Sequence, residues 1–234
     1  MNSSRLPGKA LLQAAGKPML EHLVNRLRAV PSLRGIVLAT TTNKTDDELK
    51  ELSARMGIDC YRGSENDVMT RVIGAAESVK ADIVVEITGD CPIIDPKIVE
   101  QTICVFKASK ADYVSNNRIR SFPDGMDTQV FSLEALKRSA ALTSDALDHE
   151  HVTLHIRKHP EIFTQAHLVA PQELHWPELG LTLDEPRDYE LLKKIIEYFE
   201  PNNSLFSCLE IIELLRQNPE WVAINQAVVR KGNT

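Results

Sequence analysis

The sequence lacks the features that mark several common protein classes. Its four cysteines stand far apart and form no CxxC pair. This spacing excludes the usual zinc-site patterns and argues against a disulfide framework. No apolar run reaches the length of a membrane-spanning helix, and no signal-peptide hydrophobic region is present. We therefore expect a cytoplasmic protein without a membrane partner.

Three catalytic or cofactor-binding motifs are also missing. No GxGxxG follows a strand, which argues against a redox dehydrogenase. Neither the Walker A pattern GxxxxGK[ST] nor the zinc-protease pattern HExxH occurs. The formal net charge is -6, with acidic and basic residues mixed along the chain. Because nucleic-acid binding usually needs a basic stripe, we expect no nucleic-acid partner, although a local basic cluster can still bind a nucleotide.

What is present is typical of a soluble globular protein. The chain has 234 residues, of which 43% are hydrophobic and 26% charged. This length suits one large α/β domain or two small ones. There is no internal repeat, no low-complexity run and no linker long enough to mark a second domain. We therefore predict one domain covering residues 1–234.

The hydrophobic pattern predicts strands that alternate with helices. Strands are expected at residues 35–40, 58–61, 81–88, 111–115, 128–131, 163–169 and 179–183. Helices are expected at residues 18–30, 46–56, 68–79, from 95 onward, 133–142, 145–158 and 185–199, with two more broken at Asn218-Pro219. Continuous apolar runs are typical of strands buried on both faces. The alternation predicts an α/β fold with a mainly parallel sheet and helices on both faces.

The first nine residues form a short polar segment that precedes an amphipathic helix. It contains two hydroxyls, a guanidinium, a Pro-Gly turn and a lysine: Ser3, Ser4, Arg5, Gly8 and Lys9. These groups suit a chain of phosphates, because arginine offers a fork of donors and lysine a point charge. The alternative is a polar terminus with no ligand.

Two carboxylates follow apolar runs and could share one metal ion. Asp90 lies in Gly89-Asp90-Cys91-Pro92, just past the strongest strand signal, where open α/β sheets bind ligands. Asp184 ends the run before a proline-started helix. Carboxylates at such positions suit Mg²⁺ bound together with substrate phosphates. The alternative for both is a local role, as a turn or helix cap.

Two further clusters have mainly structural interpretations. The segment His149-Glu150-His151 could bind a metal or touch a substrate, but adjacent residues on a helix point in different directions. Asp124-Gly125 is first of all a turn, and Asp127 after it could bind sugar hydroxyls. Without other information, the solvent-facing histidines and the turn are the simpler interpretations.

Several stretches together resemble the cytidylyltransferases that activate acidic sugars, including the CMP-sialic acid and CMP-Kdo synthetases. The closer likeness is to the branch called spore coat polysaccharide biosynthesis protein F. The matching stretches, in order, are residues 3–9, 16–19, 63–71, 89–95, 123–131, 150–153, 181–189 and 218–225. Each match is modest, but their joint order over nearly the whole chain is specific.

The resemblance implies a Rossmann-like nucleotide-diphospho-sugar transferase fold and Mg²⁺-dependent transfer of CMP from CTP to a sugar acid, with release of pyrophosphate. It implies a nucleotide-binding half at residues 1–115, a sugar-binding half at 116–184 and C-terminal helices at 185–234. A homodimer is possible. The roles implied are Arg5 and Lys9 on the triphosphate; Ser3, Ser4, Gly8, Asp67 and Arg71 near the nucleotide; Asp90 and Asp184 on Mg²⁺; and Asn116, Asp127, Glu150 and His151 facing the sugar.

Two other activities remain open from the sequence. One is nucleotidyl transfer to a sugar 1-phosphate or another phosphorylated small molecule. The other is an inactive nucleotide-binding homologue. The family resembled has a strand of type Ile-Ile-Gln-Ala-Arg ahead of the polar loop, so we expect a native chain that is longer at its amino end. Without that strand, unpaired backbone groups and a gap in the core are expected.

Overall fold

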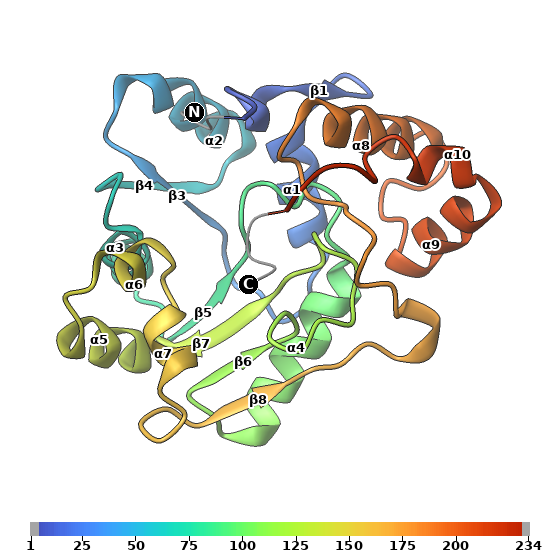
Figure 1. The fold of residues 1–234 in the computed structure, drawn as a ribbon. Coiled ribbons are helices and arrows are strands. Elements are labelled where there is room, and N and C mark those ends of the chain that lie inside the picture. Colours follow the sequence, from blue (N-terminus) through green and yellow to red (C-terminus); the bar gives the residue numbers. More distant parts are fainter. Residues whose placement is uncertain (1–4, 231–234) are drawn as a thin grey trace.

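The apolar runs predicted as strands form two main sheets in the computed structural model, which describes residues 5–230 (Figure 1). One sheet is a parallel pair, β3 (Val37–Thr41) and β4 (Asp59–Gly63). The other has the order β5-β7-β6-β8. Its strands span Ile83–Glu86, Gln129–Ser132, Tyr113–Ser115 and Gln165–His167, respectively. Strands β5, β6 and β8 run in one direction, and β7 runs opposite between β5 and β6.

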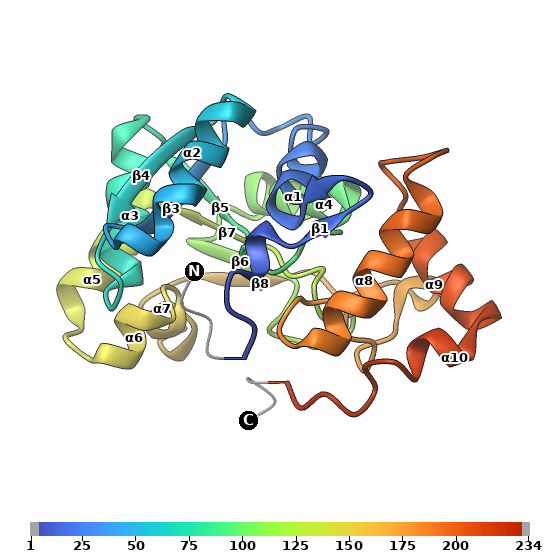
Figure 2. The same ribbon diagram turned by 90° about the horizontal axis from the view of Figure 1, so that it is seen from above.

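Helices lie on both faces of these strands, as predicted (Figure 2). One face packs against α1 (Met19–Leu27), α2 (Asp47–Met56) and α4 (Pro96–Ser109). The other packs against α3 (Val68–Ser78), α5 (Leu133–Leu142) and α7 (Leu154–Lys158). The short elements are η1 (Lys9–Leu11), β1 (Gln13–Ala14), β2 (Lys17–Pro18), η2 (Lys44–Asp46), α6 (Ala146–Glu150) and η3 (Gln172–Leu174). The α/β class with helices on both faces is therefore confirmed.

Strand periodicity explains how one sheet supports both helix layers. Successive side chains of a strand point to opposite faces. On β7, Val130 packs with the α1, α2 and α4 layer, whereas Phe131 packs with the α3, α5 and α7 layer. On β6, Val114 packs with the α1, α2 and α4 layer, and Tyr113 packs with the α3, α5 and α7 layer. All four side chains are fully buried, as continuous apolar strands predict.

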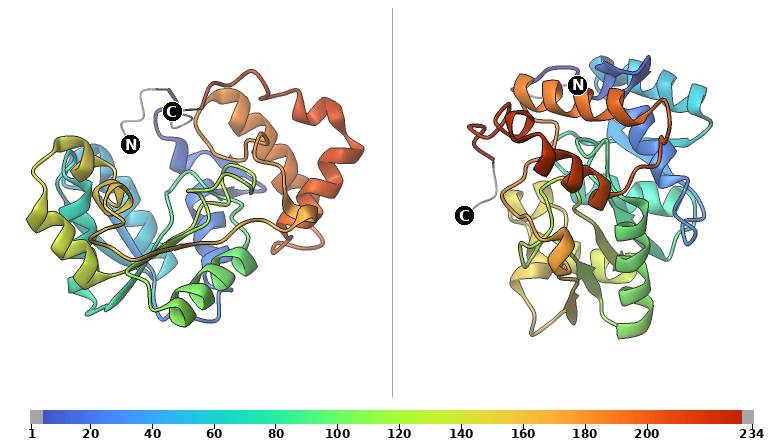
Figure 3. Two further views of the ribbon diagram at one scale, coloured as in Figure 1. Left: turned by 60° about the horizontal axis from the view of Figure 1, so that its bottom comes forward. Right: turned by 90° about the vertical axis from the view of Figure 1, so that its right-hand side faces the viewer.

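A C-terminal group of helices forms a third packed cluster at one side of the sheets (Figure 3). It contains α8 (Pro186–Phe199), α9 (Cys208–Gln217) and α10 (Pro219–Val222). Helix α8 begins with proline at its first turn and with a capping box between Glu185 and Asp188. The predicted break at Asn218-Pro219 is confirmed. This cluster also buries Phe122 and Leu181.

Two predicted elements are wrong. The single helix expected at residues 145–158 is divided into α6 and α7, because Val152 between them has a left-handed φ of 46°. The strand expected at Leu179–Leu183 is not a ladder strand. It forms one isolated bridge, between Asp124 and Gly180. The backbone groups of Leu179 and Leu181 both bond to Asp124 in the turn, so no ladder with a strand forms.

The two main sheets do not join, and a cavity lies between them. Strands β3 and β5 both line this cavity, whose volume is about 450 Å³. We call it the slot. None of the described helices is both long and apolar enough to cross a bilayer.

Candidate active site

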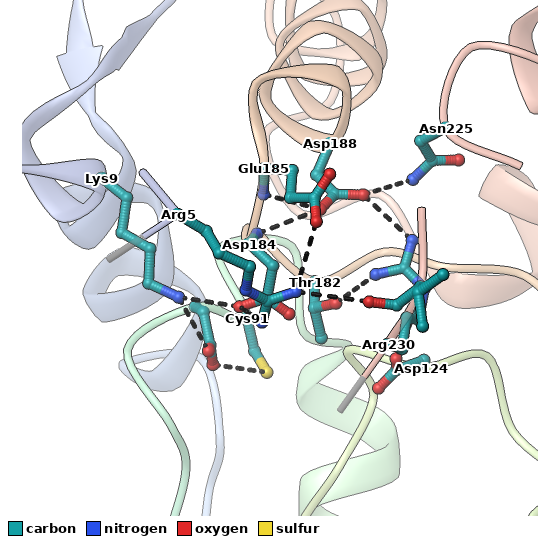
Figure 4. Close-up of polar contacts among 12 residues, drawn as sticks. Arg5, Lys9, Cys91, Asp124, Thr182, Asp184, Glu185, Asp188, Asn225 and Arg230 are labelled. Atoms are coloured by element: carbon teal, nitrogen blue, oxygen red, sulfur yellow. Dashed lines mark hydrogen bonds and ion pairs between the residues drawn. The ribbon is translucent and has the colours of Figure 1, made fainter. Parts of the chain in front are cut away.

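The predicted phosphate and metal residues meet at one point. Lys9 Nζ lies 3.0 Å from Asp90 Oδ2 and 3.1 Å from Asp184 Oδ1 (Figure 4). Asp90 is 81 residues and Asp184 175 residues from Lys9 along the chain. The fold therefore brings one cation and two carboxylates together, although their sequence positions are far apart.

Local backbone features put each group there. Gly8 adopts a left-handed φ of 68° immediately before η1, which turns the polar segment so that Lys9 starts that helix. Asp90 follows the carboxyl end of β5, at the sheet edge where α/β folds bind ligands. Asp184 precedes the first turn of α8. The ends of η1, β5 and α8 therefore lie close together and bring their polar residues to the same site.

The charges of this cluster stabilise one another. Burial alone would lower the pKa of Lys9, but Asp90 and Asp184 raise it above its ordinary value. Burial alone would raise the pKa of Asp90, but Lys9 and a hydrogen bond from Thr88 hold it below its usual range. The cluster therefore carries an ammonium and an ionised Asp90 at neutral pH.

Arg5 adds a second cation to the cluster. Its Nη2 lies 3.1 Å from Asp184 Oδ1, and its Nη1 lies 3.6 Å from Glu185. Its Nη1 also approaches the Val229 carbonyl at 3.4 Å, so the amino-terminal loop touches the carboxyl-terminal segment. Arg5 and Lys9 therefore both reach Asp184 from one short amino-terminal segment that turns at Gly8. Ser3 and Ser4, predicted beside them, lie outside the described residues.

Asp188, in the first turn of α8, supports the position of Asp184. It is fully buried and accepts hydrogen bonds from the backbone N–H groups of residues 184 and 185. Its other oxygen accepts from Asn225 and Arg230 (Figure 4). A Cβ on Gly180 would overlap the Arg230 guanidinium, so glycine there permits this contact. The network fixes the turn that carries Asp184.

Asp90 and Asp184 fit a magnesium ion that is shared with a substrate. Mg²⁺ prefers oxygen ligands and is commonly held by one or two carboxylates plus substrate phosphates. Both carboxylates reach the same Lys9 ammonium, so a small cation can approach both. The described residues contain no group of three or more His, Cys, Asp or Glu side chains arranged around a metal. Further ligands for Mg²⁺ would therefore come from phosphates and water.

A large polar cavity of about 990 Å³ opens beside this cluster. Arg230, which bonds to Asp188 in the support network, is part of its wall. Other charged or amide groups in its lining are Asn117, Arg118, Arg120, Asp124, Asp127, Arg157, Glu178, Asn225 and Gln226. Asn117 Oδ1 and Arg157 Nε are both buried without a hydrogen-bond partner. Unpaired buried polar atoms are costly, so a cavity lined by them suits a polar ligand.

The acidic side chains of this cavity have altered ionisation. Burial and the neighbouring Asp124 raise the pKa of Asp127 to about 7. Burial also raises the pKa of Asp124, although Arg230 and Arg120 oppose that change. Asp127, predicted to face the sugar, does line the cavity. Part of the population therefore carries a neutral Asp127 near pH 7.

The other predicted sugar residues lie elsewhere. Asn116 is buried, with its Nδ2 donating to the Met126 carbonyl and its Oδ1 accepting from the Thr128 N–H. It braces the loop between β6 and β7, whereas its neighbour Asn117 lines the cavity. Glu150 and His151 are exposed at the end of α6 and are not in the cavity lining. Their roles toward a sugar stay predictions.

The predicted nucleotide residues on α3 have local partners. Asp67 caps α3 by accepting from the Thr70 N–H, and it pairs with His149 Nδ1 at 2.9 Å. Arg71 donates to the Ser64 carbonyl and borders the slot. The structure therefore does not bring either side chain to Lys9 directly, and their roles near the nucleotide stay predictions.

Several cavity residues were not predicted from the sequence. Arg118 and Arg120 lie in a stretch that the sequence marks only as polar and turn-rich, and Arg157 lies among histidines on an expected helix. Trp176 and Arg230 lie in segments without a motif. A usable signal existed only for Arg118 and Arg120, since both occur a few residues before the turn at Asp124-Gly125.

Comparison with known proteins identifies the family. A family profile described as cytidylyltransferase matches residues 1–219. The chain belongs to the cytidylyltransferase family. The spore coat polysaccharide biosynthesis protein SpsF of Bacillus subtilis is 33% identical over 234 residues, spanning 97% of this chain and 95% of that protein. The resemblance seen in the sequence is thereby confirmed.

Two further similarities support the fold and the chemistry of the family. A cytidylyltransferase structure from Leptospira borgpetersenii has a TM-score of 0.90 at 31% identity, covering 98% of this chain and 95% of that one. This confirms the nucleotide-sugar transferase fold. The 3-deoxy-manno-octulosonate cytidylyltransferase of Geobacter metallireducens is 27% identical over 142 residues, which span 60% of this chain and 55% of that enzyme.

Proposed function

We propose that this cytidylyltransferase-family protein transfers CMP from CTP to a sugar acid and releases pyrophosphate, with Mg²⁺ as its cofactor, in the synthesis of a cell-surface polysaccharide. The observation that carries the proposal is the convergence of Lys9, Asp90 and Asp184 beside a large polar cavity. The cluster suits a triphosphate and its metal, and the cavity suits the acceptor. The similarity to SpsF and to an acidic-sugar cytidylyltransferase supports the same reaction class.

Arg5 and Lys9 would bind and orient the triphosphate. Both side chains form ion pairs with Asp184, so their positive charges already face a negatively charged oxygen. Phosphate oxygens entering the cluster would exchange one anionic partner for another. When bound at Asp90 and Asp184, Mg²⁺ would neutralise phosphate charge and favour departure of pyrophosphate.

The acceptor would attack the α-phosphorus of CTP with one of its oxygens. The P–O bond to the acceptor forms as the bond to pyrophosphate breaks, and the acceptor's proton passes to solvent or a nearby base. Positioning and electrostatic stabilisation supply most of the catalysis in such transfers. No side chain of the chain has to form a covalent intermediate.

The polar cavity supports an acidic acceptor. Arg118, Arg120 and Arg157 line it and can hold a carboxylate in a two-point contact. Asp127 lines the same cavity and can accept hydrogen bonds from sugar hydroxyls. Trp176 adds an apolar face against which a sugar ring can pack. A sugar acid offers all three kinds of group.

A substrate screen tests this function. Pyrophosphate release would be measured with CTP, UTP, GTP and ATP, each with Mg²⁺, against a panel of sugar acids and a matched panel of sugar 1-phosphates. We expect release with CTP and at least one sugar acid. Release only with sugar 1-phosphates would assign the alternative nucleotidyltransferase activity. Mg²⁺-dependent CTP binding without turnover on any acceptor would instead identify an inactive homologue.

A further inference from the structure

A single arginine side chain joins the active-site cluster to the wall of the polar cavity. The side chain of Arg230 is only 9% exposed, and each of its three guanidinium nitrogens faces a different partner (Figure 4). Nη2 lies 3.0 Å from Asp188 Oδ1, Nη1 donates to Thr182 Oγ1 at 2.6 Å, and Nε lies 3.6 Å from Asp124 Oδ2. We call these three contacts the arginine junction.

The middle segment of the arginine junction, residues 179–183, leads directly to Asp184. The N–H of Leu181 donates to the Asp124 carbonyl at 2.7 Å, and the N–H of Leu183 donates to the Asp90 carbonyl at 2.8 Å. The segment forms an isolated bridge rather than a ladder, so a few bonds and the arginine junction determine its path. A displacement of this segment would therefore change the distance between Asp184 and Asp90, the two proposed Mg²⁺ ligands.

The far side of the arginine junction lies in the wall of the polar cavity. Asp124 and Asp127 both line this cavity, as does Arg230 itself. Gly125 has a left-handed φ of 104°, and a Cβ there would lie 2.6 Å from the carbonyl carbon and oxygen of Leu181. The turn therefore packs directly on the segment that leads to the metal carboxylate, and the two move together or not at all.

Charge compensation explains only one of the three contacts. Asp188 is fully buried, and its other side-chain partner, Asn225, is neutral. A buried carboxylate that loses its cation is strongly destabilising, so Asp188 needs Arg230 beside it. The contacts with Thr182 and Asp124 go beyond this need. They fix the plane of the guanidinium, which a single ion pair would leave free to turn.

We propose that Arg230 is a positioning residue for nucleotidyl transfer, which holds Asp184 on the metal side and Asp127 on the acceptor side at a fixed distance from each other. The inference rests on the proposed function, because it concerns the same two substrate sites. Arg230 acts through Asp188 and residues 179–183 on one side and through the Asp124 turn on the other. Loss of a group that supports a metal ligand typically lowers metal affinity or activity about 10- to 100-fold.

Arg230→Lys is the principal test, because lysine keeps a positive charge for Asp188 but cannot place three nitrogens at once. Amide hydrogen exchange would be measured without substrates at Asp124, Leu181 and Leu183. Isothermal titration calorimetry would measure the affinity for CTP with and without Mg²⁺. We expect exchange at all three amides to accelerate about ten-fold or more, and the Mg²⁺-dependent gain in CTP affinity to fall about ten-fold.

Arg230→Ala tests the same contacts by chemical rescue. It leaves a space with the shape of a guanidinium group, so free guanidinium ion below denaturing concentrations should restore slow exchange and Mg²⁺-dependent affinity, whereas methylammonium should not. Should Arg230→Ala not fold, the readouts on Arg230→Lys decide. Arg138→Ala is the matched control, because Arg138 on α5 pairs with Asp112 away from both sites and should leave all of these readouts unchanged.

Three results would overturn the proposal. One is normal exchange at Leu181 and Leu183 in Arg230→Lys. Another is acceleration that extends equally to Val114 on β6, because Arg230 would then stabilise the whole fold. The third is faster exchange at the junction with an unchanged Mg²⁺-dependent affinity for CTP, because the arginine would then order the backbone without positioning the metal carboxylate.

Steady-state kinetics separates this inference from the proposed function. If the protein transfers CMP to a sugar acid, Arg230→Lys should lower kcat about 10- to 100-fold and raise the KM of the acceptor. Normal values of both would overturn the positioning role and leave the proposed function intact. A protein that turns over no sugar acid would contradict the proposed function, while the exchange and calorimetry measurements would still test Arg230.

Discussion

Two cavities of this protein differ in volume and in the polarity of their walls. The polar cavity has the lining of a ligand-binding site, whereas the slot has the lining of a protein core. The polar cavity of about 990 Å³ is walled by arginines, carboxylates and amides. The slot of about 450 Å³ is walled largely by valine, isoleucine, leucine and alanine from helices and strands. Water can fill the first at little cost, whereas apolar walls without a partner lose both dispersion contacts and burial.

The polar cavity is built from groups that support one another. Asp188, Asn225 and Arg230 form a closed network behind Asp184. The slot has no such internal support, since its two strand edges face each other without hydrogen bonds between them. We therefore expect changes in the polar region to alter activity or local order sharply, and changes beside the slot to have mild effects on stability.

The largest expected effect is at Lys9. Lys9→Ala removes the cation that joins Asp90 to Asp184 and that would meet the triphosphate. We expect CTP turnover to fall about 100- to 1,000-fold, as for removal of a group that stabilises transition-state charge. Steady-state kinetics would measure this. Lys17→Ala is the matched control, because Lys17 pairs with Glu200 away from the cluster and should leave turnover nearly unchanged.

Substitutions at Asp184 and Asp188 test whether the residue proposed to bind Mg²⁺ can be distinguished from the residue that supports its position. Asp184→Asn should lower turnover about 100-fold and weaken its Mg²⁺ dependence, with little change in melting temperature. Asp188→Asn should instead destabilise the fold by about 3 kcal/mol, because the Arg230 guanidinium loses its fully buried ionic partner and keeps the more distant Asp124. Kinetics and thermal unfolding would be measured for both variants. If Asp184→Asn changes only the melting temperature, Asp184 is a helix cap rather than a metal ligand.

A matched pair of valines sharpens the contrast at the slot. Val85 and Val130 face each other across β5 and β7, but Val130 is fully buried whereas Val85 lines the slot. Val130→Ala should cost about 2 kcal/mol, and Val85→Ala less than about 1 kcal/mol. Denaturant unfolding would measure both. Equal costs for the two substitutions would mean that the side chains around Val85 are packed as tightly as those around Val130.

The smallest expected effect concerns the ion pair between Asp67 at the start of α3 and His149 on α6. A hydrogen bond that His149 Nδ1 donates to the Asp67 carboxylate raises the pKa of His149, and the same bond helps to hold the pKa of Asp67 below its ordinary value. The pair stabilises the fold from above the ordinary pKa of aspartate, about 4, to below that of histidine, about 6.5. As pH rises through the raised pKa of His149, this contribution is lost.

His149→Gln should therefore destabilise the protein by about 0.5 kcal/mol at pH 5.5 and by less at pH 9. Thermal unfolding at the two pH values would measure the difference. His175→Gln is a control, since it changes a histidine outside this pair. A destabilisation by His149→Gln that is equal at both pH values would mean that the histidine acts through packing alone.

The sequence predicted the strand-end carboxylates because their positions depend on local signals. Asp90 follows an apolar run and Asp184 precedes a proline-started helix, and both signals are visible over a few residues. Their meeting at Lys9 came only from the family resemblance and the fold, since it joins residues 175 positions apart.

Other features could not be predicted because tertiary contacts override the local pattern. The run Leu179–Leu183 is apolar enough for a strand, but it packs under the C-terminal helices and bonds to the turn at Asp124. Nothing in the local sequence of β7 indicates that this strand runs antiparallel to its neighbours β5 and β6. The arginines of the polar cavity come from separated segments, so only the folded chain brings them together.

The most direct test of the central claim is ³¹P NMR of CTP with Mg²⁺ and a panel of sugar acids. It would be run on the protein and on its Lys9→Ala variant. The account predicts that the protein converts CTP into pyrophosphate and a CMP phosphodiester in equal amounts with at least one sugar acid, and that Lys9→Ala reduces this conversion strongly. Consumption of another nucleotide in preference to CTP, or no phosphodiester with any of the sugar acids, would contradict it.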